Sequence, residues 1–224
     1  MCGRFDRHSE LSAFAELIEG LVLESDPGLA SSYNIAPSQS ALVVAQGTDG
    51  NPKARSLQWG LLPGWVSKSG LSRPINARIE TAAEKPMFRN AFKKRRCVVL
   101  CDGYYEWCST ESGKQPYYFY AGDHRPFVLA GLWESNSKLT DETQTTFSIM
   151  TRQANTKVEE IHHRMPLIPD REFIREWLNP LSSPAELQQA GQSHAITDLN
   201  FYPVGTFVNS PSNNATECLK PIAV

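Results

Sequence analysis

Apolar residues near the start of the chain follow a helical rhythm. They recur at spacings of three and four positions: Leu11, Phe14, Leu17, Ile18 and Leu21. This spacing places them on one face of a helix, and Ser9 stands where an N-cap is expected. The pattern predicts an amphipathic helix over residues 9–23, ended by a Pro-Gly pair at 27–28.

A second rhythm consists of short apolar or aromatic runs separated by turn-forming residues. Ala41–Ala45 and Arg55–Leu62 predict two strands. Five further runs follow in the middle of the chain: Cys97–Cys101, Tyr104–Trp107, Pro116–Tyr120, Phe127–Trp133 and Thr145–Thr151. Runs of this length and composition predict a meander of about five strands, with a hairpin tip at residues 135–138.

Helical patterns return after these strands, at residues 155–161, 171–178 and 185–190. The last two begin directly after Pro-Asp and after a proline, which are common helix starts. No internal repeat, low-complexity tract or change of composition marks a linker. We therefore expect one α+β domain over residues 1–224, in which helices flank a mainly antiparallel sheet.

Composition narrows the class of protein. Hydrophobic residues make up 41% and charged residues 21% of the 224 positions, as in folded globular proteins. No secretory leader is evident, and no apolar run approaches the roughly 18 residues that cross a bilayer. Five cysteines form an odd set in a chain that is large enough to fold without crosslinks, so we expect free thiols in a reducing compartment. These features predict a cytoplasmic protein without membrane contact.

The charge balance limits how the protein could bind nucleic acid. The formal net charge is -2 and the pI is near 6.2. Nonspecific coating of DNA depends on an excess of Lys and Arg that releases counterions. Any contact with DNA must therefore be local.

The second residue carries the most distinctive chemistry. Removal of Met1 would leave Cys2 with a free α-amine beside its thiol, which is a 1,2-aminothiol. The reference pKa values of the two groups, about 7.7 to 8 and about 8.5, leave both partly available at neutral pH. An aldehyde could condense with the amine, and the thiol could close a five-membered ring. Attack of the thiol on an amide is the alternative chemistry, and an incidental cysteine near the start of the chain is the simplest interpretation.

Further polar clusters stand beside apolar or aromatic residues. They are Met1-Cys2-Gly3-Arg4-Phe5, Tyr33-Asn34-Ile35-Ala36-Pro37, Asn76-Ala77-Arg78-Ile79-Glu80-Thr81, Asp102-Gly103-Tyr104-Tyr105-Glu106-Trp107 and Ile161-His162-His163-Arg164-Met165-Pro166. Together they resemble the SOS-response-associated peptidase (SRAP) family, whose members are abasic-site-processing proteins. The similarity runs from Cys2 to the Leu219-Lys220-Pro221 segment. It implies an α+β fold built round a strongly curved, barrel-like antiparallel sheet, with the N-terminus opening into a DNA-binding cleft.

The resemblance also implies the catalytic residues. Cys2 corresponds to the cysteine that forms a thiazolidine with the ring-opened sugar of an abasic site, and Asn76, Glu106 and His162 correspond to the other catalytic positions. Their chemistry suits these roles. A carboxyl group held among aromatic residues should be partly desolvated, which raises its pKa toward neutrality. The histidine supplies a second proton donor or acceptor.

Each of these three positions also has a simple structural interpretation. Glu106 could be a strand-end carboxylate, His162 could cap the preceding helix, and Asn76 could be a turn residue after Pro74. The residue pattern alone leaves these alternatives open.

The DNA contacts are expected from arginines for phosphates, one tryptophan for base stacking, and two positions that match the family's DNA-binding surface. The arginines are Arg4, Arg78 and Arg164. The tryptophan is Trp65, and the two positions that match the family's DNA-binding surface are Asn34 and Pro37. Some relatives carry two tryptophans in tandem after Pro-Gly, whereas Val66 follows Trp65 here. His163 also departs from the acidic residue that is common at its position.

No metal and no cofactor are predicted. Cys97 and Cys101 lie four apart in an apolar run and should face the same side, but their spacing fits no compact zinc motif. Buried structural thiols are the better interpretation. A cluster of basic residues at positions 89–96 is interpreted as a solvated helix end, with a distal DNA contact as the alternative.

Three functional hypotheses follow. The first is covalent capture of abasic sites in single-stranded DNA through Cys2, with weak lyase activity from an imine stage. The second is a peptidase that uses Cys2 or Glu106, including cleavage of its own Met1-Cys2 bond, and the third is a noncovalent single-stranded DNA-binding module. We expect a monomer that associates with the nucleoid when bound to DNA and acts with replication-fork proteins.

Overall fold

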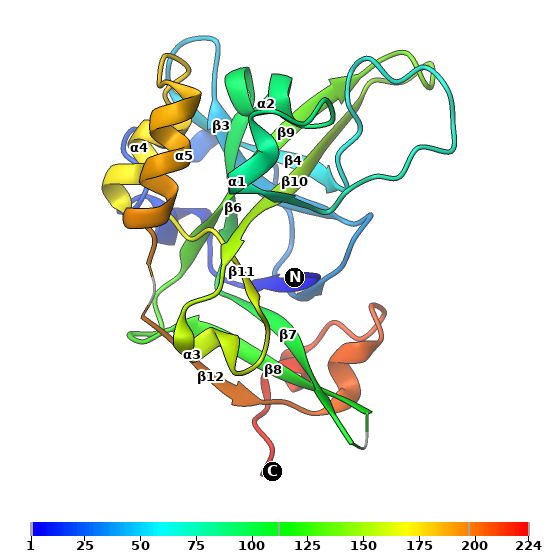
Figure 1. Cartoon of the computed structure of the whole chain (residues 1–224), viewed down its shortest axis with the longest axis vertical. Coiled ribbons are helices and arrows are strands. Elements are labelled where there is room, and N and C mark those ends of the chain that lie inside the picture. Colours follow the sequence, from blue (N-terminus) through cyan, green and yellow to red (C-terminus); the bar gives the residue numbers. More distant parts are fainter. Residues whose placement is uncertain (1, 112, 197, 224) are drawn as a thin grey trace.

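The computed structural model of the chain describes residues 2–111, 113–196 and 198–223, and it contains two β-sheets (Figure 1). The strands of the smaller sheet are, in spatial order, β12 (Leu199–Pro203), β8 (Gly113–Ala121), β7 (Gly103–Thr110), β1 (Arg4–Arg7) and β2 (Ser32–Ile35). All of its pairings are antiparallel.

The larger sheet closes on itself. Its strands are, in order, β11 (Arg164–Pro166), β10 (Gln144–Gln153), β4 (Pro52–Trp59), β3 (Ser40–Gln46), β6 (Arg96–Cys101) and β9 (Phe127–Asn136). β9 pairs back onto β10, which completes a barrel-like ring. The short β5 (Asn76–Arg78) runs parallel to β10, as does β4, and the other pairings are antiparallel. The expected curved, mainly antiparallel sheet is therefore confirmed.

Both faces of the barrel wall are buried, because alternate side chains of a strand point to opposite faces. On β3, Val43 faces the space between the two sheets, and Leu42 and Val44 face the helices. The helices that cover this outer side are α1 (Ile79–Ala82), α2 (Arg89–Lys94), α4 (Arg171–Leu178) and α5 (Pro184–Ser193). Figure 1 shows α4 and α5 side by side, on the same side of the larger sheet.

The smaller sheet is also covered on two sides. Phe5 and Tyr104 face the barrel, whereas Tyr105 and Tyr118 pack with residues of the C-terminal segment. That segment contains the 3-10 helices η3 (Thr206–Asn209) and η4 (Thr216–Leu219). Figure 1 shows it in red beside β7 and β8, with α3 (Thr156–Glu159) nearby. No helix in the described ranges is long and apolar enough to cross a membrane.

The helix expected over residues 9–23 is wrong in type. Only the 3-10 helices η1 (Leu11–Phe14) and η2 (Leu23–Ser25) form, joined by turns. Gly20 takes the left-handed backbone conformation (φ +75°), and hydrogen bonds between residues three apart dominate this segment. The apolar residues of this segment nevertheless pack against the barrel. Their spacing therefore reflects which residues are buried, although the backbone is not a continuous α-helix.

The predicted strands form close to their expected bounds, but they do not form one meander. β7 and β8 belong to the smaller sheet, whereas β6, β9 and β10 belong to the barrel. The three C-terminal helices α3, α4 and α5 are confirmed. The hairpin tip expected at 135–138 is displaced, because residues 135 and 136 still pair in β9 and the connection to β10 covers residues 137–143.

Candidate functional site

Cys2 lies directly before β1, in the core between the two sheets. Its side chain is 0% exposed and belongs to the same apolar cluster as Tyr104 and Cys101. Burial raises the pKa of the Cys2 thiol well above its usual range, and the nearby negative charge of Glu106 raises it further. The resting sulfur is therefore a neutral thiol that needs a base before it can act as a nucleophile.

Asn76 holds the backbone of Cys2. It lies on β5, which β10 positions by parallel pairing opposite Ile149. The Asn76 side-chain Nδ2 donates a hydrogen bond to the Cys2 carbonyl oxygen at 2.8 Å. Asn76 Oδ1 is buried and has no hydrogen-bond partner within the described ranges. A buried acceptor of this kind is suited to receive a hydrogen bond from an amine or a hydroxyl group.

Glu106 is the buried carboxyl group of the site. It lies two residues after Tyr104 on β7, so both side chains point toward the barrel. The side chain is nearly inaccessible, and burial raises the pKa of Glu106 to about 7. This agrees with the expectation from its aromatic neighbours. A carboxyl group with this pKa exchanges a proton readily at neutral pH.

His162 approaches Glu106 from the loop after α3. Its Nδ1 lies 3.7 Å from Glu106 Oε1 and accepts a hydrogen bond from the Arg164 backbone N–H at 2.9 Å. The same Nδ1 lies 3.2 Å from the Arg164 carbonyl oxygen, so the backbone of Arg164 holds this edge of the ring. Burial lowers the pKa of His162, so the neutral imidazole is favoured.

The four residues expected to be catalytic therefore lie together. They come from the N-terminal segment, β5, β7 and the loop after α3, which are far apart in the sequence. The arrangement combines a nucleophile with one carboxyl group near its titration midpoint and one neutral imidazole. It can carry out nucleophilic attack with proton transfer in both directions.

A cavity of about 470 Å³ opens beside Glu106 and His162. Its lining consists of Arg4, Glu106, Trp107, Lys114, His162 and Asn209. β1 pairs with β7 only as far as the Arg4 and Tyr105 pair. Glu106 and Trp107 therefore pair with β8 on one side and have no β1 partner on the other. The cavity occupies this open end of the sheet.

Of the six predicted DNA contacts, Arg4 belongs to this cavity lining and the other five lie outside it. Trp65 is 50% exposed in the loop after β4, and Arg78 is exposed at the end of β5. Arg164 is largely buried, and its guanidinium group binds the Glu80 carboxylate through two hydrogen bonds of 2.7 and 2.9 Å. A phosphate that reaches Arg164 would meet this ion pair.

Arg4 and Asn34 bind each other and the C-terminal segment. Arg4 Nη1 donates to Asn34 Oδ1 at 2.7 Å and to the Val208 carbonyl at 2.8 Å. The Asn34 amide donates to three backbone carbonyls, and the side chain is 1% exposed. Pro37 is half-buried just after β2. The DNA-contact roles of all six predicted residues stay predictions.

Sequence reasoning missed three residues of the cavity: Trp107, Lys114 and Asn209. The Trp107 indole Nε1 donates to Asn209 Oδ1 at 2.8 Å, and the Arg4 guanidinium lies 5.7 Å from the centre of the Trp107 ring. Lys114 falls between the predicted strands 104–107 and 116–120, and its position on the face of Trp107 follows only from the β7–β8 register. Asn209 gave no signal in the sequence.

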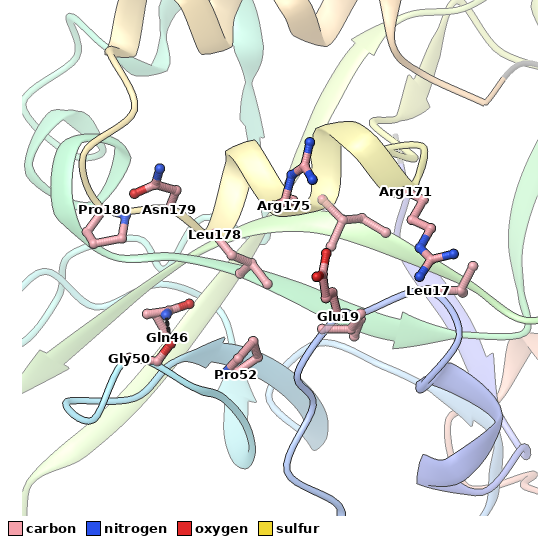
Figure 2. A pocket seen from close by; sticks show the side chains of 12 residues that line it. Leu17, Glu19, Gln46, Gly50, Pro52, Arg171, Arg175, Leu178, Asn179 and Pro180 are labelled. Carbon is pink, nitrogen blue, oxygen red and sulfur yellow. Dashed lines mark hydrogen bonds between the residues drawn. The ribbon is translucent and has the colours of Figure 1, made fainter.

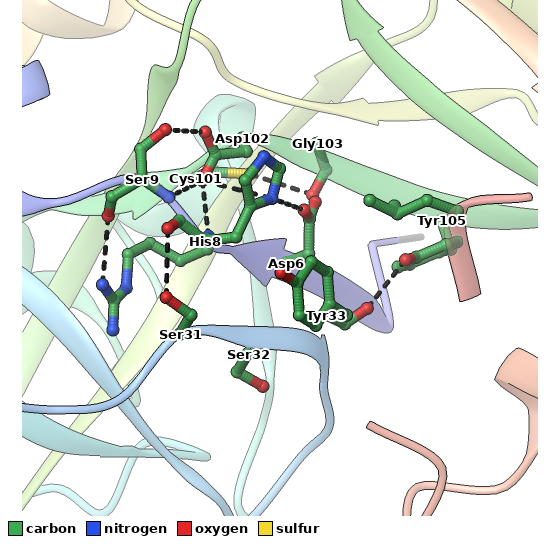
Figure 3. Close-up of polar contacts among 12 residues, drawn as sticks. Asp6, His8, Ser9, Ser31, Ser32, Tyr33, Cys101, Asp102, Gly103 and Tyr105 are labelled. Carbon is green, nitrogen blue, oxygen red and sulfur yellow. Dashed lines mark hydrogen bonds and ion pairs between the residues drawn. The ribbon is translucent and has the colours of Figure 1, made fainter. Parts of the chain in front are cut away.

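Another polar cluster lies around β1 and the turn before β7 (Figure 3). Oxygen and nitrogen atoms of Asp6, His8 and Asp102 lie within 4.8 Å of one another, a spacing that could hold a metal ion. Most of these atoms already make hydrogen bonds. Asp6 Oδ2 lies 2.8 Å from His8 Nδ1, and Asp102 Oδ2 accepts the backbone N–H groups of His8 and Ser9. Hydrogen bonds therefore link Asp6 to His8, and Asp102 to the backbone of His8 and Ser9.

A hollow of about 280 Å³ lies between α4 and the N-terminal turns (Figure 2). Leu17, Ile174 and Leu178 form apolar lining, with Arg171 and Arg175 beside them. Its lining contains no cysteine, histidine or buried carboxylate. The chemistry-bearing residues therefore gather at Cys2 and not here.

The chain is similar to known proteins along nearly its whole length. Residues 1–211 match the family described as SOS response associated peptidase (SRAP). The chain is 36% identical to the abasic site processing protein YoqW of Bacillus subtilis (strain 168), over 98% of this chain and 99% of that protein. It is 32% identical to the abasic site processing protein YedK of Escherichia coli (strain K12), over 99% and 100% of the two chains.

More distant proteins show the same likeness. The abasic site processing protein HMCES of Gallus gallus is 33% identical over 85% of this chain and 66% of that protein. A crystal structure of a protein from Bacteroides thetaiotaomicron superposes with a TM-score of 0.82 at 28% identity, covering 99% and 100% of the two chains. The chain therefore belongs to the SOS response associated peptidase (SRAP) family.

Proposed function

We propose that this protein processes abasic sites in single-stranded DNA by joining its N-terminal cysteine covalently to the sugar. The observation that carries the proposal is the convergence of Asn76, Glu106 and His162 on Cys2. The relatives named above as abasic site processing proteins support the same substrate. The reaction requires the α-amine of Cys2 and therefore removal of Met1.

The first step is attack of the Cys2 amine on C1′ of the ring-opened sugar. A C–N bond forms, one amine proton passes to the aldehyde oxygen, and loss of that oxygen as water leaves a protonated imine. Protonated Glu106 donates the proton that the departing oxygen needs, which its pKa of about 7 allows at neutral pH. Asn76 holds the Cys2 carbonyl, and its free Oδ1 can orient the amine.

The second step closes the ring. Glu106, now a carboxylate, removes the proton of the buried thiol, the sulfur attacks C1′ of the protonated imine, and the nitrogen becomes a neutral amine that keeps its one proton. A C–S bond replaces the C=N π bond, and the product is a thiazolidine. Aldehyde and aminothiol combine with loss of one water and no change of oxidation state. His162 supplies the second proton donor or acceptor for opening the sugar and for this step.

The DNA strand is held by groups around this centre. Trp65 offers an exposed ring for base stacking, and Arg78 offers an exposed guanidinium for a phosphate. Arg164 contributes if the phosphate displaces Glu80, and Arg4 contributes from the cavity wall. A local set of contacts fits the net charge of -2.

Intact mass spectrometry tests the covalent step. The full chain, confirmed by mass to lack Met1, is incubated with a single-stranded oligonucleotide that carries one abasic site. We expect a gain equal to the oligonucleotide less one water, and no gain with Cys2→Ala or with an undamaged strand. Borohydride should leave the product mass unchanged, because a thiazolidine, unlike an imine, has no C=N bond to reduce.

Absence of an adduct on the Met1-free protein would contradict the proposal. Cys2→Ser separates it from peptidase chemistry, because an oxygen nucleophile can still cleave an amide, whereas an oxazolidine is much less stable than a thiazolidine. A product that borohydride reduces by two hydrogens would show that the reaction stops at the imine. Strand cleavage by β-elimination, the lyase reaction, would then compete.

A further inference from the structure

The cavity beside Glu106 has a composition that the reaction at Cys2 does not explain. Beyond Glu106 and His162, its wall is formed by Arg4, Trp107 and Asn209, with Lys114. The covalent steps use none of these last four groups, and of the four the proposed function assigns only Arg4 to the DNA strand. Their chemistry therefore indicates what else the cavity holds.

The floor of the cavity is fixed in place. Arg4 donates to the Val208 and Asn209 carbonyls at 2.8 and 3.5 Å, and it lies over the Trp107 ring. Trp107 in turn donates to the Asn209 side chain. A guanidinium group held by neutral oxygens and an aromatic ring keeps its positive charge uncompensated, because no carboxylate pairs with it among the described residues.

Lys114 adds a second positive charge on the same face. It is exposed on β8, opposite Ser109 of β7, and alternation places it on the side of Trp107. Its ammonium group makes no ion pair with a carboxylate in the described residues. Two positive charges without ionic partners thus face one open cavity in a protein whose net charge is -2.

We infer that this cavity binds a phosphodiester group of the DNA strand next to the abasic nucleotide, with Lys114 as its main charged contact and Arg4 as a fixed second one. Phosphate is the anion that a DNA strand necessarily brings close to C1′, because the abasic sugar carries one phosphate on each side. The site holds one flanking phosphate and so fixes where the aldehyde meets Cys2. The inference rests on the proposed function, whose substrate it positions.

Noncovalent binding tests the subsite apart from the chemistry. The probe is a single-stranded oligonucleotide with a tetrahydrofuran abasic analogue, which has no aldehyde and cannot crosslink. Lys114→Gln should weaken binding by about three- to fivefold, as expected for an exposed ion pair. The slope of log K against log salt should become shallower by about 0.7, the value for one phosphate contact on a single strand. Lys114→Arg should restore both.

Lys53→Gln is the matched control. Lys53 is a partly exposed lysine at the start of β4, and Figure 1 shows the β3–β4 hairpin at the opposite end of the molecule from the β7–β8 hairpin. Lys53→Gln removes the same charge as Lys114→Gln, so an effect of net charge alone would appear in both variants. An equal change of slope in Lys53→Gln and Lys114→Gln would overturn the inference.

A neutral linkage identifies the phosphate. Oligonucleotides with a single methylphosphonate on either side of the analogue are bound to wild type and to Lys114→Gln. At one of the two positions, we expect the losses of binding free energy from the methylphosphonate and from Lys114→Gln to be non-additive, because both changes remove the same contact. Full additivity at both positions would overturn the inference.

Two further outcomes are distinguishable. If Lys114→Gln leaves the salt slope unchanged and only shifts the pH profile of crosslinking, Lys114 acts on Glu106 and the subsite is wrong. If wild type gives no adduct with a true abasic site but the methylphosphonate coupling is present, the covalent proposal fails and the phosphate site stands.

Discussion

Two buried carboxyl groups on neighbouring strands, Asp6 and Glu106, have a similarly raised pKa but lie on opposite faces of the sheet. Burial raises the pKa of Asp6 on β1 and of Glu106 on β7 to about 7. Glu106 points toward the barrel and lines an open cavity together with His162. Asp6 points to the other face, where His8 covers it and the Tyr33 ring stacks on His8 (Figure 3).

The comparison shows that a raised pKa records burial and does not by itself mark an active site. Glu106 combines that pKa with a cavity, a nearby thiol and a second titratable group. Asp6 instead contacts the His8 ring, and Asp102 accepts hydrogen bonds from two consecutive backbone N–H groups and from the Ser9 hydroxyl. Access to substrate separates the two clusters.

The largest expected effect is on the rate of crosslinking. Glu106→Gln keeps the shape of the side chain but removes its proton transfer, so we expect a loss of about 10²- to 10⁴-fold. Asp6→Asn makes the matching change on the opposite face and should leave the rate per folded molecule within about twofold, since the typical effect of proton transfer is absent there. Single-turnover kinetics with an abasic oligonucleotide measures both.

The pH profile sharpens this prediction. The wild-type rate should show an inflection near pH 7, the pKa of Glu106, which Glu106→Gln lacks and Asp6→Asn retains. If Asp6→Asn also removes the inflection, the Asp6 cluster takes part in the chemistry and the distinction between the two faces fails.

The next effect is on stability, where the two carboxyl groups should behave alike. The folded pKa of each lies above its unfolded value near 4, so the proton is held more tightly in the folded state. Their contribution is fully present below about pH 4 and is lost as the pH rises to about 7. Each should account for a decrease on the order of 2 to 4 kcal/mol in the free energy of unfolding.

Asp6→Asn and Glu106→Gln should both flatten this pH dependence relative to wild type. His8 has a pKa that Asp6 raises, so its contribution is lost in the same direction. Asp6→Asn should therefore flatten the curve more than Glu106→Gln. Urea denaturation between pH 4 and pH 8 provides the measurement, and a steeper curve in either variant would reverse the sign of the assigned shift.

The same two faces show how far the sequence alone could reach. The strand runs around Val99, Tyr105 and Phe147 were predictable, because buried strands need continuous or alternating apolar residues. The pairing partners of these strands were not predictable. No local pattern distinguishes β8, which joins the smaller sheet, from β9, which joins the barrel. The segment around Ile18 failed as a helix, since the spacing of buried residues is similar in a chain of tight turns.

The site shows the same limit. Cys2, Asn76, Glu106 and His162 could be named from motifs that resemble a known family, and the desolvation of Glu106 followed from its aromatic neighbours. The fixing of Arg4 by the Val208 carbonyl could not be predicted, because that contact joins residues about two hundred positions apart. The cavity wall formed with Lys114 depends on the β7–β8 register and was missed for the same reason.

The smallest expected effect distinguishes two adjacent tyrosines on β7. Tyr105 points toward the C-terminal segment, and its hydroxyl donates a hydrogen bond to the Tyr33 carbonyl at 2.7 Å. Tyr104 points toward Cys2, and its buried hydroxyl has no hydrogen-bond partner in the described ranges. Tyr105→Phe should lower the free energy of unfolding by about 1 kcal/mol, because it leaves a carbonyl without its donor.

Tyr104→Phe should leave stability unchanged or raise it by up to about 1 kcal/mol, because it removes a buried polar group that gains no hydrogen bond. Urea denaturation at one pH measures both variants, and the ring packing of each residue is preserved by phenylalanine. If Tyr104→Phe destabilises the protein as much as Tyr105→Phe does, the hydroxyl beside Cys2 is satisfied. The face that holds the reactive cysteine would then be as fully hydrogen-bonded as the face that holds Asp6.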